Sequence, residues 1–262
     1  MVYGLDKFKE AFTEYKEQYV LIGGTACDLI MKEYDSSFRA TKDFDLVLIV
    51  EALTPEFGQA FWNFIKDGKY YNKSMSTEEP HFYRFEKPEE PGFPYMLELF
   101  SRNAFTLNYP DSNLTPLKFN DSVSSLSAIL LNDAYYDMLL NGREEIDGVQ
   151  VLALTYLIPF KAKAWLDLSE KRKNGFHVDE RDIKKHKNDI ARLATILNDS
   201  SAVQLPEEVT NDMQEFIRRY EQSPVYMKSL KIRGITNTQI LERLKRIYQS
   251  LSLIHISEPT RH

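Results

Sequence analysis

Two aspartates one residue apart, Asp43 and Asp45, have the types and spacing of metal ligands. They stand at the start of the segment 44–50, whose branched apolar residues predict a β-strand. Side chains alternate along a strand with period two, so both carboxylates project from one face. Two like charges this close repel each other unless a cation compensates them, and ligands that are oxygen only select Mg²⁺ or Mn²⁺ over zinc. The pair therefore predicts a magnesium site.

Glu98 is a third candidate ligand, because it is a lone carboxylate in the apolar segment 95–100. On a strand beside the two aspartates it would complete the metal site, whereas burial without a partner would cost free energy. Two other interpretations stay open. Glu98 can face outward from its strand, and an Asp-x-Asp pair by itself is also typical of an exposed turn.

Gly23 and Gly24 form a glycine pair between a short strand predicted over 19–22 and a helix predicted over 25–32. The absence of side chains lets backbone N–H groups and the Thr25 hydroxyl approach an anion at the helix N-terminus, which suits a triphosphate. Thr25 is also the expected N-cap of the helix. Glycine pairs serve ordinary tight turns as well. The Walker and dinucleotide-binding glycine patterns are absent, which disfavours P-loop and Rossmann chemistry.

The elements that must position these residues predict an α+β fold. Apolar runs predict the strands 19–22, 44–50, 81–86, 95–100, 125–131 and 149–152, and helical periods predict the helices 5–15, 25–32 and 57–65. The segment 87–92 has turn composition, so the strands on either side of it are expected to form a hairpin. Only helical periods follow residue 153. We therefore expect a sheet domain over 1–153 and a helical domain over 154–250.

The last segment, 251–262, has neither a helical period nor caps. Its residues match the in-frame translation of a transposase-based sequencing adapter, so we expect a non-native tail and exclude it from fold reasoning. A native tail without regular structure is the alternative interpretation.

Composition limits the class of protein. The 262 residues are 43% hydrophobic and 13% aromatic, which excludes a disordered or low-complexity chain. The single cysteine, Cys27, cannot form an internal disulfide or a cysteine-based zinc site, and this fits a reducing compartment. No secretory signal pattern is visible and no apolar run reaches about 20 residues. We expect a cytoplasmic protein with no membrane partner.

Charge is distributed unevenly along the chain. The net charge of −6 argues against coating of nucleic acid by bulk electrostatics. Residues 161–192, however, include ten basic and six acidic residues, a net charge of +4. A polyanion such as tRNA could dock on this segment. An ordinary lysine-rich solvated helix is the alternative.

The pattern Arg39-x-Thr41-x-Asp43-x-Asp45, after a glycine pair and before an acid on a later strand, resembles the nucleotidyltransferase superfamily with the DNA polymerase beta-type fold. It is most similar to the branch of AbiE-type abortive-infection effectors and MenT toxins. The resemblance implies a mixed sheet with flanking helices, followed by a helical C-terminal domain. Two features depart from the branch: the third acid is a glutamate, and the segment 169–179 separates the two later motifs.

The resemblance continues into the helical domain. The segment 161–164 is similar to the branch's Lys-x-x-Ala motif, and the segment 182–186 is similar to its helical aspartate motif. We prefer Lys161 over Lys163 as the functional lysine, because it stands three residues before the alanine of the motif and the two lysines cannot share a helix face. Lys163 is then a surface residue.

A helix expected over 178–197 carries Asp182, His186 and Asp189 beside its apolar stripe. These three polar residues lie at the edge of the surface on which the helix packs, which favours a role for Asp182. The alternative is a solvated face on which Asp182 pairs with Lys185 or His186 and Asp189 pairs with Lys185.

The resemblance implies transfer of a nucleoside monophosphate from an NTP to an acceptor, with release of pyrophosphate. The implied ligands of Mg²⁺ or Mn²⁺ are Asp43, Asp45 and Glu98, of which Glu98 would also take the acceptor proton. The implied nucleotide-binding residues are Gly23, Gly24, Thr25, Arg39, Thr41 and Lys161. The implied catalytic set is Asp43, Asp45, Glu98, Lys161 and Asp182.

The branch also implies a toxin or phage-defence effector that modifies tRNA or another RNA and has a cognate antitoxin protein. Two alternatives stay open. One is a small-molecule nucleotidyltransferase of the antibiotic-modifying type, and the other is a binding module that holds a nucleotide or an antitoxin without turnover. Metal-dependent NTP consumption separates the enzymes from the binding module.

Overall fold

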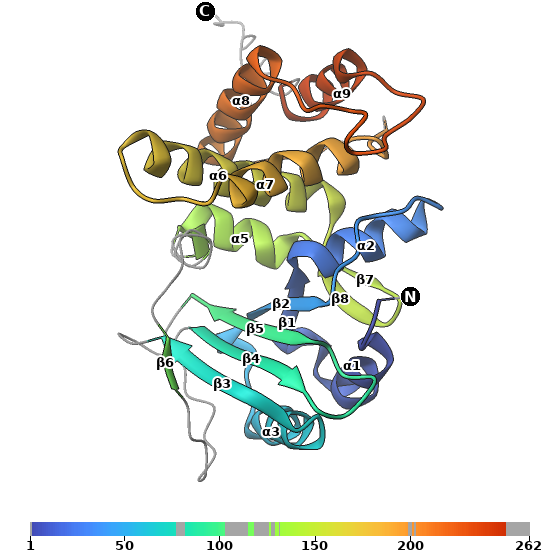
Figure 1. The fold of residues 1–262 in the computed structure, drawn as a ribbon, viewed down its shortest axis with the longest axis vertical. Helices are drawn as coiled ribbons and strands as arrows, with labels where there is room; N and C mark the ends of the chain where they lie inside the picture. The colour runs from blue at the N-terminus through green and yellow to red at the C-terminus, as the bar shows by residue number, and fades with distance from the viewer. Residues whose placement is uncertain are drawn as a thin grey trace, which may run out of the picture. The chain divides into compact units, whose positions relative to one another are not determined.

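The described residues are 2–76, 82–102, 115–117, 126, 129–130, 132–198, 201 and 203–249 of a computed structural model of the chain. The chain divides into a sheet unit, Met1–Leu157, and a helical unit, Ile158–His262. The division falls inside helix α6 (Leu154–Lys173), whose start is the boundary expected from the sequence. Figure 1 shows the strands in the blue-to-green part of the chain and helices in its orange-to-red part.

One mixed sheet contains the strands of the described residues. They are β1 (Tyr19–Ile22), β2 (Asp43–Leu48), β3 (Tyr70–Ser76), β4 (Phe82–Pro88), β5 (Met96–Ser101), β6 (Thr115–Leu117), β7 (Arg143–Ile146) and β8 (Val149–Leu152). Their order across the sheet is β6-β3-β4-β5-β2-β1-β8-β7. Strand β2 is parallel to β5 and antiparallel to β1, and the expected hairpin of β4 and β5 is confirmed. The sheet and its helices confirm the α+β class.

The helices of the sheet unit cover apolar residues of the strands. They are α1 (Leu5–Phe12), the 3₁₀ turn η1 (Thr13–Gln18), α2 (Gly23–Glu33), the 3₁₀ turn η2 (Val50–Ala52), α3 (Pro55–Asp67) and α5 (Asp133–Asn141). Thr54 caps α3 by accepting a hydrogen bond from the backbone N–H of Phe57 at 3.3 Å, and Pro55 occupies the first turn.

The packing of α1 decides which face of β2 carries the aspartates. Phe44 of β2 is buried, with its ring 5.3 Å from Phe8 of α1, and Phe8 also contacts Phe64 of α3 at 6.2 Å. Because neighbouring residues of a strand face opposite sides, Asp43 and Asp45 lie on the face away from this aromatic cluster. The period-two prediction for β2 is therefore confirmed.

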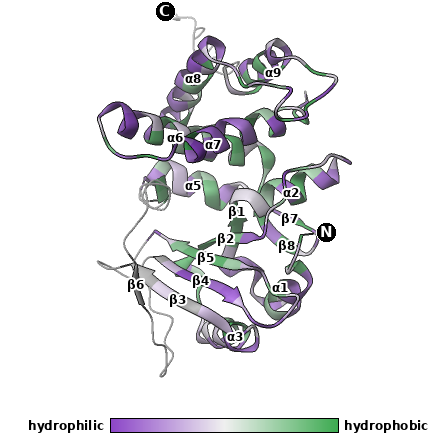
Figure 2. Cartoon of the chain, viewed as in Figure 1, coloured by the Kyte–Doolittle hydropathy of each residue, from purple (hydrophilic) through white to green (hydrophobic). Residues whose placement is uncertain are grey.

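The helical unit continues α6 and contains α7 (Glu180–Leu193), α8 (Glu207–Gln222) and α9 (Asn237–Gln249). Asp179 caps α7 by accepting a hydrogen bond from the backbone N–H of Arg181 at 2.8 Å. The core includes Trp165 of α6, whose ring meets Phe216 of α8 edge-on at 5.4 Å. In Figure 2 hydrophilic colour covers much of α7 and α8, whereas β5 of the sheet unit is mostly hydrophobic.

Several local expectations were wrong or incomplete. Helix α2 begins at Gly23, its N-cap is Ile22, and Thr25 does not cap it. In the expected strand 125–131 the described residues, 126 and 129–130, are helical, and the rest of that range lies outside the described residues. The tail 251–262 also lies outside them. No helix among the described residues is both long enough and apolar enough to cross a membrane.

Candidate metal and nucleotide site

Three charged side chains lie in one row across neighbouring strands of the sheet. Strand β5 lies between β2 and β4 (Figure 1). Asp45 of β2 is in register with Glu98 of β5, and Glu98 is in register with Arg84 of β4. Residues that are paired in register have side chains on the same face, so the three groups meet. Arg84 donates a hydrogen bond from Nε to Oε1 of Glu98 at 2.7 Å, and its Nη2 contacts the same oxygen. We call these three residues the central row.

Glu98 is buried, with 8% of its surface exposed. Burial raises the pKa of Glu98 from its usual 4.5 to about 8; the negative charge of Asp45 adds to this effect and the guanidinium of Arg84 opposes it. In the metal-free protein a proton is thus favoured at this pair of carboxylates. A divalent cation would replace that proton, and the oxygen-only donors fit Mg²⁺.

Asp43 lies on the same face of β2 as Asp45, and both are partly accessible while Phe44 between them is buried. In the described part of the chain, no group of three or more His, Cys, Asp and Glu side chains is arranged to hold a metal ion. The structure brings Asp45 and Glu98 together in register, and Asp43 stays a predicted third ligand.

The glycine pair packs directly against Asp45. Gly23 has φ +67°, and a Cβ on it would lie 1.7 Å from Oδ2 of Asp45. A Cβ on Gly24 would lie 2.8 Å from Oγ1 of Thr41 and 3.3 Å from Nη2 of Arg39. Larger residues are excluded at both positions, because the strand and the segment before it approach the turn too closely. The fold thus joins the turn, the Arg-x-Thr segment and the metal-ligand candidates in one place.

Thr25 has a different role from the expected one. Its side chain is fully buried, and its hydroxyl donates a hydrogen bond to the backbone carbonyl of Asp43 at 2.8 Å. The hydroxyl therefore ties α2 to the first residue of β2 and does not point to an open anion site. Thr25 thus holds the start of α2, where the glycine turn follows β1, against the start of β2. The prediction that it approaches a triphosphate does not fit this geometry.

The helical unit buries a second ion pair. Lys161 of α6, 5% exposed, lies 3.1 Å from Oδ2 of the fully buried Asp189 of α7. Asp182 is partly exposed and is not a member of this pair. Lys163 lies 3.2 Å from Asp167 and takes part in a partly exposed pair, as expected for a surface lysine.

Sequence reasoning missed the roles of Arg84 and Asp189. It placed Asp189 on a face where Lys185 could pair with it, yet the residue is followed by the buried Ile190 and Ala191. This apolar context was the available signal. For Arg84 the available signal was that it is the one Lys or Arg in the predicted strand 81–86.

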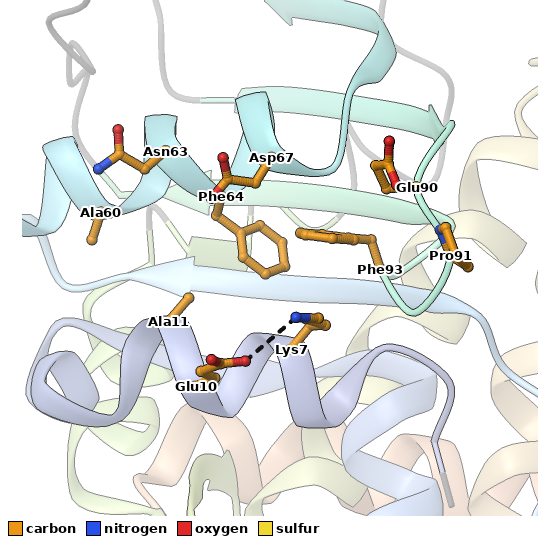
Figure 3. Close-up of a pocket in the computed structure, with 10 residues that line it drawn as sticks. All are labelled: Lys7, Glu10, Ala11, Ala60, Asn63, Phe64, Asp67, Glu90, Pro91 and Phe93. Atoms are coloured by element: carbon orange, nitrogen blue, oxygen red, sulfur yellow. Dashed lines mark ion pairs between the residues drawn. The ribbon is translucent and has the colours of Figure 1, made fainter.

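A surface cavity of about 620 Å³ lies elsewhere in the sheet unit, between α1, α3 and the connection of β4 to β5 (Figure 3). Phe64 and Phe93 form its apolar part, and Glu10, Asp67 and Glu90 are at its rim. The lining includes none of the predicted site residues. The cavity and the central row are therefore separate features.

No family model matches the chain, and a search of curated proteins found no match. The function must be argued from the residues and their geometry.

Proposed function

We propose that the protein is a metal-dependent nucleotidyltransferase that transfers a nucleoside monophosphate from an NTP to an acceptor hydroxyl. The observation that carries this proposal is the contact between the glycine turn and the acid pair. A Cβ on Gly23 would overlap Asp45, which is itself in register with Glu98. The two requirements of this chemistry are backbone N–H groups that can bind phosphate and a carboxylate pair for Mg²⁺, and the glycine turn beside Asp45 and Glu98 supplies candidates for both.

In this reaction the acceptor oxygen forms a bond to the α-phosphorus, the bond from that phosphorus to the β-phosphate oxygen breaks, and pyrophosphate leaves. Asp45 and Glu98, joined by Asp43, would hold Mg²⁺, which supplies positive charge to the triphosphate when bound. Glu98 is the candidate acceptor of the hydroxyl proton, the role that the resemblance implies for it.

Arg39 and Thr41 are the candidate nucleotide contacts on the other side of the turn. The guanidinium of Arg39 lies next to Gly24 and 5.1 Å from the ring centre of Phe38. A guanidinium at this place can bind phosphate oxygens in a bidentate manner. In the helical unit Lys161 remains the candidate cation for the departing pyrophosphate that the resemblance implies, and its acidic partner is Asp189.

We further propose that the acceptor is RNA, tRNA in particular, and that the protein is the toxic half of a pair with an antitoxin. The resemblance to the AbiE and MenT branch and the net charge of +4 over residues 161–192 support this choice. Phe176, 63% exposed in the loop after the basic end of α6, offers a ring on which a base can stack.

One observation favours a small-molecule acceptor instead. Several cations of the basic segment face acids of the same segment: Arg172 lies 3.9 Å from Glu180, Lys184 lies 2.7 Å from Glu180, and Arg181 lies 2.7 Å from Asp179. This internal pairing lowers the positive potential that an RNA would meet.

The deciding experiment incubates the purified protein with each labelled NTP, Mg²⁺ and total RNA, and follows the label. Label in RNA supports the RNA acceptor. Pyrophosphate release only with added small hydroxyl compounds supports the alternative acceptor, and binding of NTP without turnover supports a binding module. Expression of the wild-type chain should slow growth, and Asp45→Asn should relieve this. Harmless expression together with unlabelled RNA would refute the toxin proposal.

A further inference from the structure

We propose that Arg84 is a positioning residue that holds Glu98 ready to bind the metal ion. This inference rests on the proposed function, because it assumes that Glu98 is a metal ligand. It concerns a different residue, however, which neither the motif nor the spacing of the acids identifies.

The geometry of the contact is specific. Nε and Nη2 of Arg84 both bind Oε1 of Glu98, at 2.7 Å for Nε. Asp45 is in register with Glu98 on the neighbouring strand β2, so the Glu98 carboxylate lies between the guanidinium and a second acid. Since Arg84 and Glu98 are in register on antiparallel strands, the backbone of the hairpin fixes this contact.

The permanent charge of Arg84 keeps this contact in place. A guanidinium stays protonated at all accessible pH values, so it holds the Glu98 carboxylate in one orientation before a metal binds. Glu86, two residues further along β4, lies at the outer limit of ion pairing with Arg84, 4.0 Å away. Arg84 is thus placed among carboxylates of two strands, and the shorter contact is to Glu98.

Positioning makes a different prediction from a merely structural ion pair. Partners that orient a metal ligand typically change metal affinity or activity by about 10- to 100-fold when removed. A structural pair would change the stability of the sheet but not the affinity of the folded protein for metal. Arg84→Met removes the charge at similar length, and Arg84→Lys keeps the charge but loses the two-nitrogen contact.

The test measures binding of Mn²⁺ to the full chain by calorimetry, without nucleotide, and checks the fold by circular dichroism. We expect Arg84→Met to weaken Mn²⁺ binding by about 10-fold or more, with Arg84→Lys between it and the wild type. The matched control is Arg143→Met, because Arg143 pairs with Glu17 at 3.1 Å outside the central row. This control should keep wild-type affinity.

A double variant separates action through Glu98 from a general loss of charge. In the Glu98→Gln background, Arg84→Met should cause no further loss of Mn²⁺ affinity, since residue 98 then no longer supplies a carboxylate to the metal. Wild-type Mn²⁺ affinity in folded Arg84→Met would overturn the inference, as would failure of both Arg84→Met and Arg84→Lys to fold. If the wild-type chain binds no Mn²⁺ and consumes no NTP, the proposed function itself fails. This outcome differs from failure of the Arg84 inference, in which the wild-type chain binds Mn²⁺ and Arg84→Met binds it equally well.

Discussion

The sheet unit and the helical unit each contain an ion pair with a buried carboxylate, and the two pairs differ in their neighbours. In the sheet unit Arg84, which is partly buried, pairs with Glu98, and a second carboxylate, Asp45, lies beside Glu98. In the helical unit the buried Lys161 pairs with Asp189, and a second cation, Arg192, lies 3.9 Å from that carboxylate. A buried pair by itself is weak evidence for stability.

The neighbours suggest different tasks for the two pairs. Asp45 gives the central row an excess of acid, so a proton or a divalent cation is needed to balance it. Arg192 gives the Asp189 pair an added positive charge, so this pair needs no cation and suits either a structural role or attraction of an anion. Each task can be tested by removing one member.

The largest effect on transfer is expected when one carboxylate of the acid excess around Asp45 is removed. Asp45→Asn removes a metal-binding charge at nearly constant volume, so transfer of label should fall below detection while circular dichroism remains that of the wild type. Asp43→Asn should act in the same way if Asp43 joins the ligands. Full transfer by either variant would mean that its carboxylate is not required for metal binding.

The next effect concerns the helical pair. Lys161→Ala leaves Asp189 buried without this partner, and we expect a loss of about 3–5 kcal/mol in the free energy of unfolding, measured by urea titration. Lys163→Ala is the control, because its partners are partly exposed and the pair is worth only about 0–1 kcal/mol. Lys161→Ala should also weaken transfer more than Lys163→Ala, and equal losses would show that the functional lysine was wrongly chosen.

A double variant tells a structural pair from a functional one. Lys161→Met with Asp189→Leu replaces the buried charges by apolar side chains of similar size, so stability should return to about the wild-type value. Transfer should stay low if the pair acts on the nucleotide. A stable and fully active double variant would assign the pair to structure alone and leave the sheet unit as the only site of chemistry.

A smaller effect is expected from salt. If the basic segment of the helical unit holds RNA through two phosphate contacts, RNA labelling should fall by roughly tenfold between 50 and 200 mM salt. A small neutral acceptor should show little change over this range. A flat salt profile with RNA as acceptor would exclude the basic segment as a docking surface.

Local pattern predicted the parts of the site that lie within one strand. The alternation of Asp43, Phe44 and Asp45 is visible in the sequence, and so is the glycine pair that ends β1. The pairing of β2 with β5 could not be predicted from the sequence, because parallel strands are joined by a long connection that sets no register. Glu98 was therefore a candidate from its apolar context, and its place beside Asp45 came from the fold.

Tertiary contacts account for the missed residues. Thr25 has the type of an N-cap, but β2 lies close enough for its hydroxyl to bind the Asp43 carbonyl, and this contact determines its role. Asp189 had a lysine within reach on its own helix, whereas its observed partner, Lys161, is 28 residues away on α6. Helical spacing identifies neighbours within one helix and gives no information on which other helix packs against it.

The last effect concerns the dependence of the melting temperature on pH and metal at Glu98. Since its pKa is raised from 4.5 to about 8 in the folded protein, the folded state binds more protons than the unfolded state between these values. The contribution of this group to stability is thus present below about pH 4.5 and is lost as the pH rises to about 8. Mg²⁺ takes the place of the proton, so the stabilising effect of Mg²⁺ should grow over the same range.

Melting curves with EDTA and with Mg²⁺ at several pH values measure both trends, and Glu98→Gln, which cannot ionise, should remove the difference between the two sets of curves. If the wild type and Glu98→Gln depend on pH and Mg²⁺ in the same way, Glu98 neither holds that proton nor binds the metal.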